Sequence, residues 1–218
     1  MHKSIINLIE IKKEINLKNL DPVSKVKIIA ISKTFPIDDI LPLIDHGHLD
    51  FGENKVQEAS LKWSEIKSKN SNINLHMVGK LQTNKVKEAV KLFDYIHSLD
   101  SPKLAKKISN EQNKITKKIK IFIQINIGDE NQKSGIKIEN LNNFYKKCVN
   151  DLDLNIVGLM CIPPKDSSPN NYFLKMSEIT KSFKFKELSM GMSSDYIEAI
   201  NHGATFVRIG SKILGKRS

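Results

Sequence analysis

Short apolar runs alternate with amphipathic stretches along almost the whole chain. The clearest run, 119–127 (IKIFIQINI), is rich in β-branched residues and predicts a strand. Each run is followed by a stretch with apolar positions at helical spacing, and this alternation is typical of an α/β protein with a parallel sheet. The predicted strands span 27–32, 48–52, 74–79, 93–98, 119–127, 154–160, 185–190 and 204–209.

Helices are predicted before the first strand and after every strand. The first helix, over 4–20, carries apolar residues that recur on one face. The others are predicted over 37–46, 53–69, 82–91, 101–117, 138–150, 170–182, 194–202 and 211–215. Eight strand–helix units joined by short connections favour a closed (β/α)8 TIM barrel, with an open doubly wound sheet as the alternative.

The chain is predicted to form a single α/β domain. Its 218 residues match the usual size of a (β/α)8 barrel, and no low-complexity linker divides them. The predicted domain covers 1–218, with an N-terminal helix in 1–20 and the barrel in 27–215. No apolar run reaches the length of a membrane span, and the N-terminus lacks the pattern of a secretory signal.

The chain is basic, with 33 Lys, 2 Arg and a formal net charge of +11. A basic charge can indicate nucleic-acid binding. The lysines are spread around the predicted helices rather than grouped with aromatic residues, which predicts a solvated surface and disfavours a dedicated nucleic-acid function. Cys148 and Cys161 lie in a predicted helix and strand without a CxxC spacing. They indicate neither a disulfide scaffold nor a metal site, and they predict a reducing, cytoplasmic location.

Lys33 directly follows the first predicted strand, in the segment 27–36 (KIIAISKTFP). An α/β barrel places its functional residues at the carboxyl ends of its strands. Lys33 is therefore a candidate functional residue, although a lysine can also simply mark the point where a strand reaches water. Other candidates at strand ends are Ser32, Gly52, Glu53, Asn54, His76, Gly79, Ser98, Gln124, Asn126, Met160, Ser189 to Ser193, Arg208, Gly210 and Ser211.

Two glycine turns near the end of the chain have the chemistry of a phosphate site. The segment 188–195 (LSMGMSSD) places Gly191 between a strand and a helix, and 207–213 (VRIGSKI) does the same with Gly210 and Ser211. Glycine lets the backbone approach an anion, which the free N–H groups at a helix N-terminus can then hold. Barrels commonly bind phosphate after their seventh and eighth strands. The alternative is two ordinary glycine turns with serine caps.

Closure of the barrel would bring Lys33 beside the eighth strand and the phosphate turns. A phosphate site with a neighbouring amine suggests pyridoxal 5′-phosphate (PLP), held through a lysine Schiff base. A simple sugar-phosphate site would use the turns as well, but it would not account for the position of Lys33.

Seven segments in order along the chain make the sequence similar to a known family. The sequence resembles the pyridoxal phosphate homeostasis proteins, small barrels that are similar to the N-terminal domain of alanine racemase. The resemblance implies a PLP-binding barrel of fold type III. The matching segments are ISKTFP (31–36), DFGENKVQE (50–58), LHMVGKLQTNK (75–85), IHSLDS (96–101), IQINIGDENQKSGI (123–136), VGLMCIPP (157–164) and LSMGMSSDYIEAINHGATFVRIGSKILGKR (188–217).

The resemblance also implies roles for individual residues. Lys33 would form the Schiff base with PLP, and Arg208 would face the pyridine nitrogen. The chain departs from the family at Phe35, a position that is often smaller or polar, and in a short segment after Pro164. The other implied cofactor-binding residues are Ser193, Gly210 and Ser211 at the phosphate, with Asn54 and Met190 in the pocket lining.

The same features favour a PLP carrier over an enzyme. An arginine only donates hydrogen bonds and stays charged, so beside the pyridine nitrogen it would keep that nitrogen unprotonated and weaken the ring as an electron sink. A second, β-rich domain like that of alanine racemase is not expected. His76 has no second metal ligand at a suitable spacing, and Glu53 has no evident acid/base partner.

We therefore expect a monomeric cytoplasmic protein that binds and buffers PLP and takes part in PLP (vitamin B6) homeostasis. Apo-PLP enzymes would be its recipients. Two alternatives remain at this point. One is a PLP-dependent amino-acid racemase or lyase, and the other is an interaction module that works through the basic surface.

Overall fold

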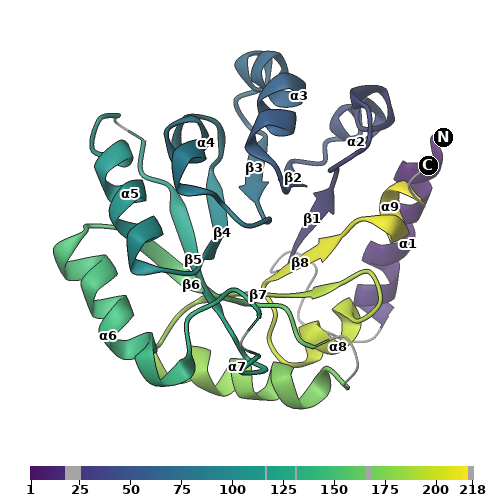
Figure 1. Ribbon diagram of the computed structural model, residues 1–218. Coiled ribbons are helices and arrows are strands. Elements are labelled where there is room, and N and C mark those ends of the chain that lie inside the picture. Colours follow the sequence, from purple (N-terminus) through teal and green to yellow (C-terminus); the bar gives the residue numbers. More distant parts are fainter. Residues whose placement is uncertain (18–25, 116, 131, 165–167, 216–218) are drawn as a thin grey trace.

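Parallel strands close into an eight-stranded barrel with helices around it (Figure 1). In this computed structural model the described residues are 1–17, 26–115, 117–130, 132–164 and 168–215. Each strand pairs with the next one in the sequence, and β8 pairs with β1. The strands are β1 (Lys27–Ile31), β2 (Asp50–Glu53), β3 (Asn74–Met77), β4 (Tyr95–Leu99), β5 (Lys120–Ile125), β6 (Asn155–Cys161), β7 (Glu187–Met192) and β8 (Phe206–Ile209).

The helices alternate with the strands, so the predicted TIM barrel and its N-terminal helix are confirmed. Residues 18–20, the end of the predicted first helix, lie outside the described residues. The α-helices are α1 (Lys3–Leu17), α2 (Leu41–Asp45), α3 (Val56–Lys69), α4 (Val86–Leu92), α5 (Pro102–Gln112), α6 (Leu141–Lys146), α7 (Asn170–Ser182), α8 (Tyr196–Asn201) and α9 (Ser211–Leu214). Short 3₁₀ helices span Ile37–Asp39, Thr83–Lys85 and Ile138–Asn140, and Lys147–Asp151 forms a π-helix.

The helix predicted over 37–46 is divided into a 3₁₀ turn and α2. Pro42 lies at the start of α2 and has no N–H, so it cannot continue a helical hydrogen-bond ladder from the residues before it. The helix predicted over 53–69 begins only at Val56, because Glu53 is still part of β2. These differences move helix boundaries and leave the order of elements unchanged.

Helix α1 packs beside α9, so the two ends of the described chain lie close together (Figure 1). The Asn7 side-chain amide donates a hydrogen bond to the Ile213 carbonyl at 2.9 Å. Leu8, Ile11 and Ile15 form the buried face of α1. Their spacing is the helical periodicity that the sequence displays, and it attaches α1 to the outside of the barrel.

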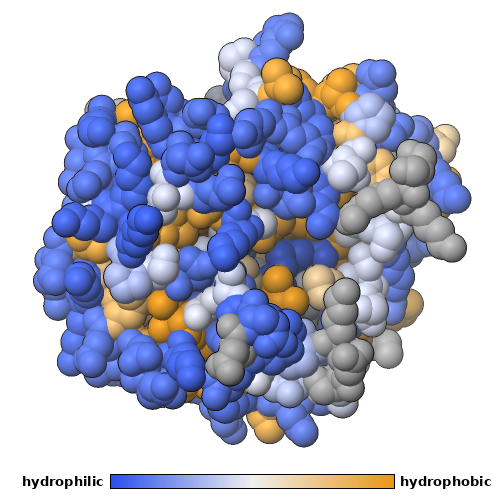
Figure 2. Space-filling view, in the orientation of Figure 1, coloured by the Kyte–Doolittle hydropathy of each residue, from blue (hydrophilic) through white to orange (hydrophobic). Residues whose placement is uncertain are grey.

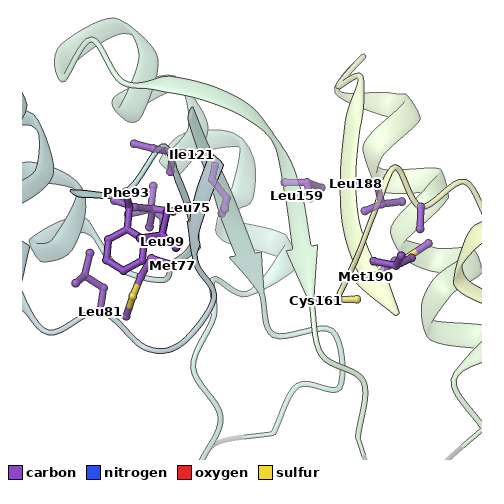
Figure 3. Packing of buried hydrophobic residues seen from close by; sticks show 14 of the residues in the cluster. Leu75, Met77, Leu81, Phe93, Leu99, Ile121, Leu159, Cys161, Leu188 and Met190 are labelled. Atoms are coloured by element: carbon purple, nitrogen blue, oxygen red, sulfur yellow. The ribbon is translucent and has the colours of Figure 1, made fainter. Parts of the chain in front are cut away.

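Alternation along the strands produces two apolar layers. Side chains that point outward, such as Leu75 and Leu188, pack against the helices in the larger layer, part of which appears in Figure 3. Side chains that point inward fill the barrel itself. The inner apolar cluster consists of Ile29, Ile31, Tyr95, Phe122, Met160 and Phe206.

Two histidines share the interior of the barrel with these apolar residues. The ring of His76 stacks on Tyr95 with centroids 4.4 Å apart, and the ring of His97 stacks on Phe122 at 4.3 Å. Both imidazoles are fully buried. Burial lowers the pKa of each ring below its usual value, and the nearby positive Arg208 lowers that of His97 further.

The face of the protein shown in Figure 2 is largely hydrophilic, with hydrophobic residues visible in patches between the polar ones. None of the helices in the described part of the chain is both long and apolar enough to cross a membrane.

The close packing of β6 on β7 predicts the effect of one substitution. A Cβ at Gly158 would lie 1.9 Å from the Glu187 carbonyl oxygen, so Gly158→Ala must separate the strands. We expect a loss of at least about 1–3 kcal/mol in the free energy of unfolding, measured by urea denaturation. Gly47→Ala is the control, because space around it is open and only its positive φ of 85° is strained, at about 1 kcal/mol. An equal loss in both variants would contradict the packing argument.

The burial of His48 predicts that the free energy of unfolding decreases as the pH falls. Burial lowers the pKa of His48 to about 4, while an unfolded histidine titrates near 6.5. Between these values the unfolded chain binds a proton that the folded protein does not, so stability decreases as pH falls. His48 alone should account for roughly 2 kcal/mol between pH 7 and pH 5.

His48→Gln should remove this share of the pH dependence, and the exposed His46→Gln should not. Urea denaturation of both variants at the two pH values measures the difference. An unchanged pH dependence in His48→Gln would show that His48 is not the responsible group.

Candidate functional site

A cavity of about 590 Å³ opens at the carboxyl ends of β1, β7 and β8. Five of the seven residues implied to bind the cofactor line it, namely Lys33, Ser193, Arg208, Gly210 and Ser211. They come from three segments that are adjacent only because β8 pairs with β1. The structure therefore brings the candidate amine, the arginine and both glycine turns to one place.

Apolar side chains form the rest of this cavity. Ile31 and Val78 contribute from the inner face of the barrel, while Ile162 and Met192 lie nearer the opening, where each is more than one-third exposed. An apolar wall with a few converging polar groups is the usual composition of a small-molecule site. A flat, partly apolar ligand with an anionic end would fit this distribution.

Lys33 lies in a tight turn directly after β1. The Phe35 N–H donates to the Ser32 carbonyl at 3.2 Å, and Thr34 has a φ of 68°. A positive φ is uncommon for a residue with a Cβ, so the surrounding contacts must hold this turn in place. The residues on both sides of Lys33 are indeed hydrogen-bonded to side chains of β2 and α3.

Glu53 fixes the residue before Lys33. It is fully buried, and its Oε1 accepts hydrogen bonds from Ser32 Oγ at 2.8 Å, Lys62 Nζ at 3.0 Å and Trp63 Nε1 at 3.0 Å. Lys62 forms a buried ion pair with Glu53, a contact that the sequence did not indicate. The two residues are nine positions apart, and only the packing of α3 on β2 brings them together.

Lys62 and Glu58 continue this network to the residue after Lys33. Lys62 Nζ also donates to the Ser32 carbonyl at 2.8 Å and to Glu58 Oε1 at 3.2 Å. The Thr34 N–H donates to Glu58 Oε1 at 2.5 Å. Burial by itself would raise the pKa of Glu58, but the hydrogen bonds from Thr34 and Lys62 lower it below its usual value. An ionised Glu58 thus holds the turn that carries Lys33.

The two glycine turns meet through one hydrogen bond. The Gly210 N–H donates to Ser193 Oγ at 3.2 Å. Gly191 has a φ of 89°, and a Cβ there would lie 2.6 Å from the Cβ of Ala199. Helices α8 and α9 have six and four residues, so their dipoles are small and hydroxyl and N–H groups must hold any anion here.

Arg208 is the buried cation of the cavity, with only 6% of its surface exposed. Its Nη1 donates to Ser189 Oγ at 2.7 Å and its Nη2 to the Cys161 carbonyl at 2.9 Å. Burial lowers the pKa of Arg208, although a guanidinium stays protonated. Within the described part of the chain, no carboxylate forms an ion pair with it. A buried cation in this state favours a ligand that accepts hydrogen bonds.

Asn54 and Met190, the two other residues implied to line the pocket, do not line this cavity. Asn54 lines a neighbouring depression of about 490 Å³ together with Lys80 and Gln82. Met190 is fully buried with Leu188 in the outer layer (Figure 3). Its neighbour Ser189 points into the barrel, so alternation turns Met190 outward.

Met192 contributes the thioether of the cavity instead. The pairing of β7 with β8 shifts register between Ser189 and Met192, which changes the alternation and turns Met192 toward the opening. A shift of this kind leaves no pattern in the sequence. Val78 could have been identified from the sequence as a lining residue. It lies two positions after the inward-facing His76 on the same extended segment, so alternation turns it inward as well.

Comparisons with known proteins show the family to which the chain belongs. Residues 7–218 match the family described as "Alanine racemase, N-terminal domain". The pyridoxal phosphate homeostasis protein of Pasteurella multocida is 37% identical over 206 residues, which cover 90% of this chain and 88% of the relative. That of Haemophilus influenzae is 38% identical over 203 residues, covering 88% and 86%.

A solved structure is similar over the same extent. PipY of Synechococcus elongatus, in the structure with PLP bound, superposes with a TM-score of 0.82 at 31% sequence identity, covering 92% of this chain and 97% of PipY. The match in sequence and fold spans the strand ends that form the cavity. The chain therefore belongs to the family of pyridoxal phosphate homeostasis proteins, which share the barrel of the alanine racemase N-terminal domain.

Proposed function

We propose that this protein binds PLP in the cavity at the mouth of the barrel and acts as a carrier and buffer of the cofactor. The observation that carries this proposal is the convergence of Lys33, Arg208, Ser193 and Gly210 on one cavity. The relatives are named pyridoxal phosphate homeostasis proteins, and PipY has been solved with PLP bound.

The residues of the cavity fit the three parts of PLP. Ser193, Gly210 and Ser211 offer hydroxyl and N–H groups for the phosphate. The apolar side chains, Ile31 among them, suit the faces of a flat ring. Arg208 has five N–H donors, and its two hydrogen bonds inside the barrel leave others for the ring nitrogen.

PLP supplies an aldehyde that reacts with a primary amine. Lys33 provides that amine from a turn that Glu53 and Glu58 hold on both sides. Lysine is suited to the role because its amine becomes nucleophilic when it loses a proton, which an arginine does not do. The clamped turn limits the positions from which the amine can reach the cofactor.

The composition of the cavity supports binding over catalysis. Among the described residues that line it, the titratable side chains are Lys33 and Arg208. Arg208 remains a hydrogen-bond donor, so it would keep the ring nitrogen unprotonated and the ring a weak electron sink. A racemase or lyase depends on that electron sink and on further proton-transfer groups.

The cellular part of the proposal follows from the same chemistry. A bound aldehyde reacts less with other amines in the cell, and reversible binding allows transfer to apo-enzymes. We propose that the protein does this as a monomer in the cytoplasm. Two cysteines without a disulfide, Cys148 and Cys161, support a reducing compartment, and burial raises the pKa of both thiols to about 12.

The direct test is the absorption spectrum of the purified protein with PLP, followed by borohydride reduction and peptide mapping. We expect a visible band and a reduced label on Lys33. Lys33→Ala should lose both, because no other amine stands in the same clamped turn. Lys55→Ala is the matched control, since this exposed lysine lies beside the neighbouring depression and should keep the band and the label.

A label on another lysine, or an unchanged band in Lys33→Ala, would refute the site. Steady turnover of amino acids by the PLP-loaded protein, lost in Lys33→Ala, would replace the carrier with an enzyme. Transfer of PLP to an apo-enzyme, followed as recovered activity of that enzyme, tests the carrier directly.

The clamp around Lys33 predicts a second effect. Glu58→Ala removes the acceptor of the Thr34 N–H, so the turn should become less ordered. We expect PLP affinity to fall about tenfold, since a hydrogen bond to a charged group contributes about 1.5–3 kcal/mol. Spectroscopic titration with PLP measures this change.

Helix α3 offers a matched control for Glu58. Glu65 pairs with Lys69 at the same i, i+4 spacing as Glu58 with Lys62, but it is exposed and makes no contact with the turn. Glu65→Ala should bind PLP like the unchanged protein. If both variants bound equally well, the clamp would have no part in cofactor binding.

A further inference from the structure

Five polar side chains are joined by hydrogen bonds into a continuous file that crosses the interior of the barrel from Arg208 to Asp50. Arg208 Nη1 lies 2.7 Å from Ser189 Oγ, which lies 2.9 Å from His97 Nδ1. His97 Nε2 lies 3.0 Å from His76 Nδ1, and His76 Nε2 lies 3.0 Å from Asp50 Oδ1. Four hydrogen bonds thus join side chains of β8, β7, β4, β3 and β2.

The chemistry of the groups fixes the direction of every bond in this file. Asp50 only accepts, so His76 Nε2 carries the proton it donates, and the neutral ring accepts at Nδ1. His97 Nε2 therefore carries the proton that is donated to His76 Nδ1, and the neutral His97 ring accepts at its own Nδ1 from the Ser189 hydroxyl. The Ser189 oxygen is then left to accept from Arg208. All four bonds therefore point from Arg208 toward Asp50.

The ionisation states that this assignment needs agree with the surroundings. Burial would raise the pKa of Asp50, but the hydrogen bond from His76 and the charge of Lys27 lower it overall, so Asp50 is an anion. Burial lowers the pKa of both imidazoles, which keeps them neutral. Each ring can then have only one N–H.

Aromatic side chains hold the two imidazoles in place. His76 is stacked on Tyr95 and His97 on Phe122, and the ring of Phe206 lies 5.9 Å from each of them. Neither histidine is exposed to solvent. Hydrogen bonds in such a dry environment are strong and reinforce one another along a chain.

The two ends of the file lie in different surroundings. The Asp50 side chain is 17% exposed at the start of β2, which is the amino end of the barrel. Arg208 lines the cavity at the opposite end. Among the described residues no carboxylate forms an ion pair with Arg208, although the charge of Asp195 acts on it, and the file joins the guanidinium through neutral side chains to Asp50 across the barrel.

We propose that Ser189, His97 and His76 are positioning residues for the cofactor. They fix the guanidinium of Arg208 so that its remaining N–H groups face the cavity, and they link its charge to Asp50. This inference rests on the proposed binding of PLP. A merely structural file would stabilise the barrel equally well without any effect on a ligand in the cavity.

The direction of the file is testable without any ligand. Two-bond ¹H–¹⁵N correlation spectra of the protein at pH 7 report the tautomer of each histidine. We expect both His76 and His97 as neutral rings with the proton on Nε2. A proton on Nδ1 of either ring, or a charged ring, would overturn the assignment whether or not PLP binds.

The effect on the ligand is tested with Ser189→Ala. This change removes the acceptor of Arg208 Nη1 and the donor to His97 Nδ1 together. We expect PLP to bind about tenfold more weakly, with a shifted absorption maximum of the bound cofactor. Ser109→Ala is the control, since Ser109 is also a buried serine and its hydroxyl donates a hydrogen bond at 2.8 Å to the Leu152 carbonyl, away from the file.

Ser109→Ala should lower the melting temperature and leave PLP affinity and spectrum unchanged. If Ser189→Ala also left both unchanged, the positioning role would be refuted. If the unchanged protein failed to bind PLP, the proposed function would fail instead, and the two failures are thereby distinguished.

His97 provides a rescue experiment. A glutamine there can accept from Ser189 with its amide oxygen and donate to His76 with its amide nitrogen, while a phenylalanine can do neither. We expect His97→Phe to weaken PLP binding and shift the absorption maximum, and His97→Gln to restore most of both. Equal binding by the two variants would contradict a role that depends on the hydrogen bonds.

Discussion

The pairing of β8 with β1 is the constraint on which the site depends. It sets Ile29 opposite Arg208 and Ala30 opposite Ile209, so the turn after β1 and the turn after β8 leave the barrel side by side. Lys33 and Ser211 are 178 positions apart in the sequence and line the same cavity only through this pairing. A Cβ at Gly210 would already lie 3.3 Å from the Cβ of Ile31. An open sheet of the same strands would separate the amine from the phosphate turns.

The turn that carries Lys33 illustrates how a barrel holds a reactive side chain. Thr34 has an unfavourable positive φ, and the compensating contacts come from Glu58 and from the buried pair of Glu53 and Lys62. Burying an ion pair gives little net stability, because both charges lose their hydration. Its role here is to fix the position of the turn, since Lys62 donates hydrogen bonds to Ser32, Glu53 and Glu58 and so holds them together.

The sequence was sufficient to predict the parts of the site that follow from periodicity and strand order. Lys33, Ser193, Gly210 and Arg208 follow predicted strands or belong to their ends, and closure places them together. Met192 shows the limit of this reasoning, because it faces the cavity only after a register shift in the pairing of β7 with β8. The same holds for Lys62, whose partner Glu53 lies on another element and is met only through the packing of α3. Contacts between elements and irregular pairing depend on the three-dimensional fit of side chains, which no spacing along the chain encodes.

The lack of an ion-pair partner for Arg208 among the described residues has a consequence for the kind of ligand the cavity attracts. A carboxylate beside a guanidinium would cancel its field within the cavity. Asp195 acts on Arg208 only through its charge, without an ion pair, and Asp50 lies at the far end of a hydrogen-bonded file of neutral side chains, so a positive potential from Arg208 remains in the cavity. A low-dielectric site of one sign concentrates ligands of the opposite sign, and the net charge of +11 adds a long-range attraction. A small anion with an apolar ring is favoured there over a neutral molecule of the same shape.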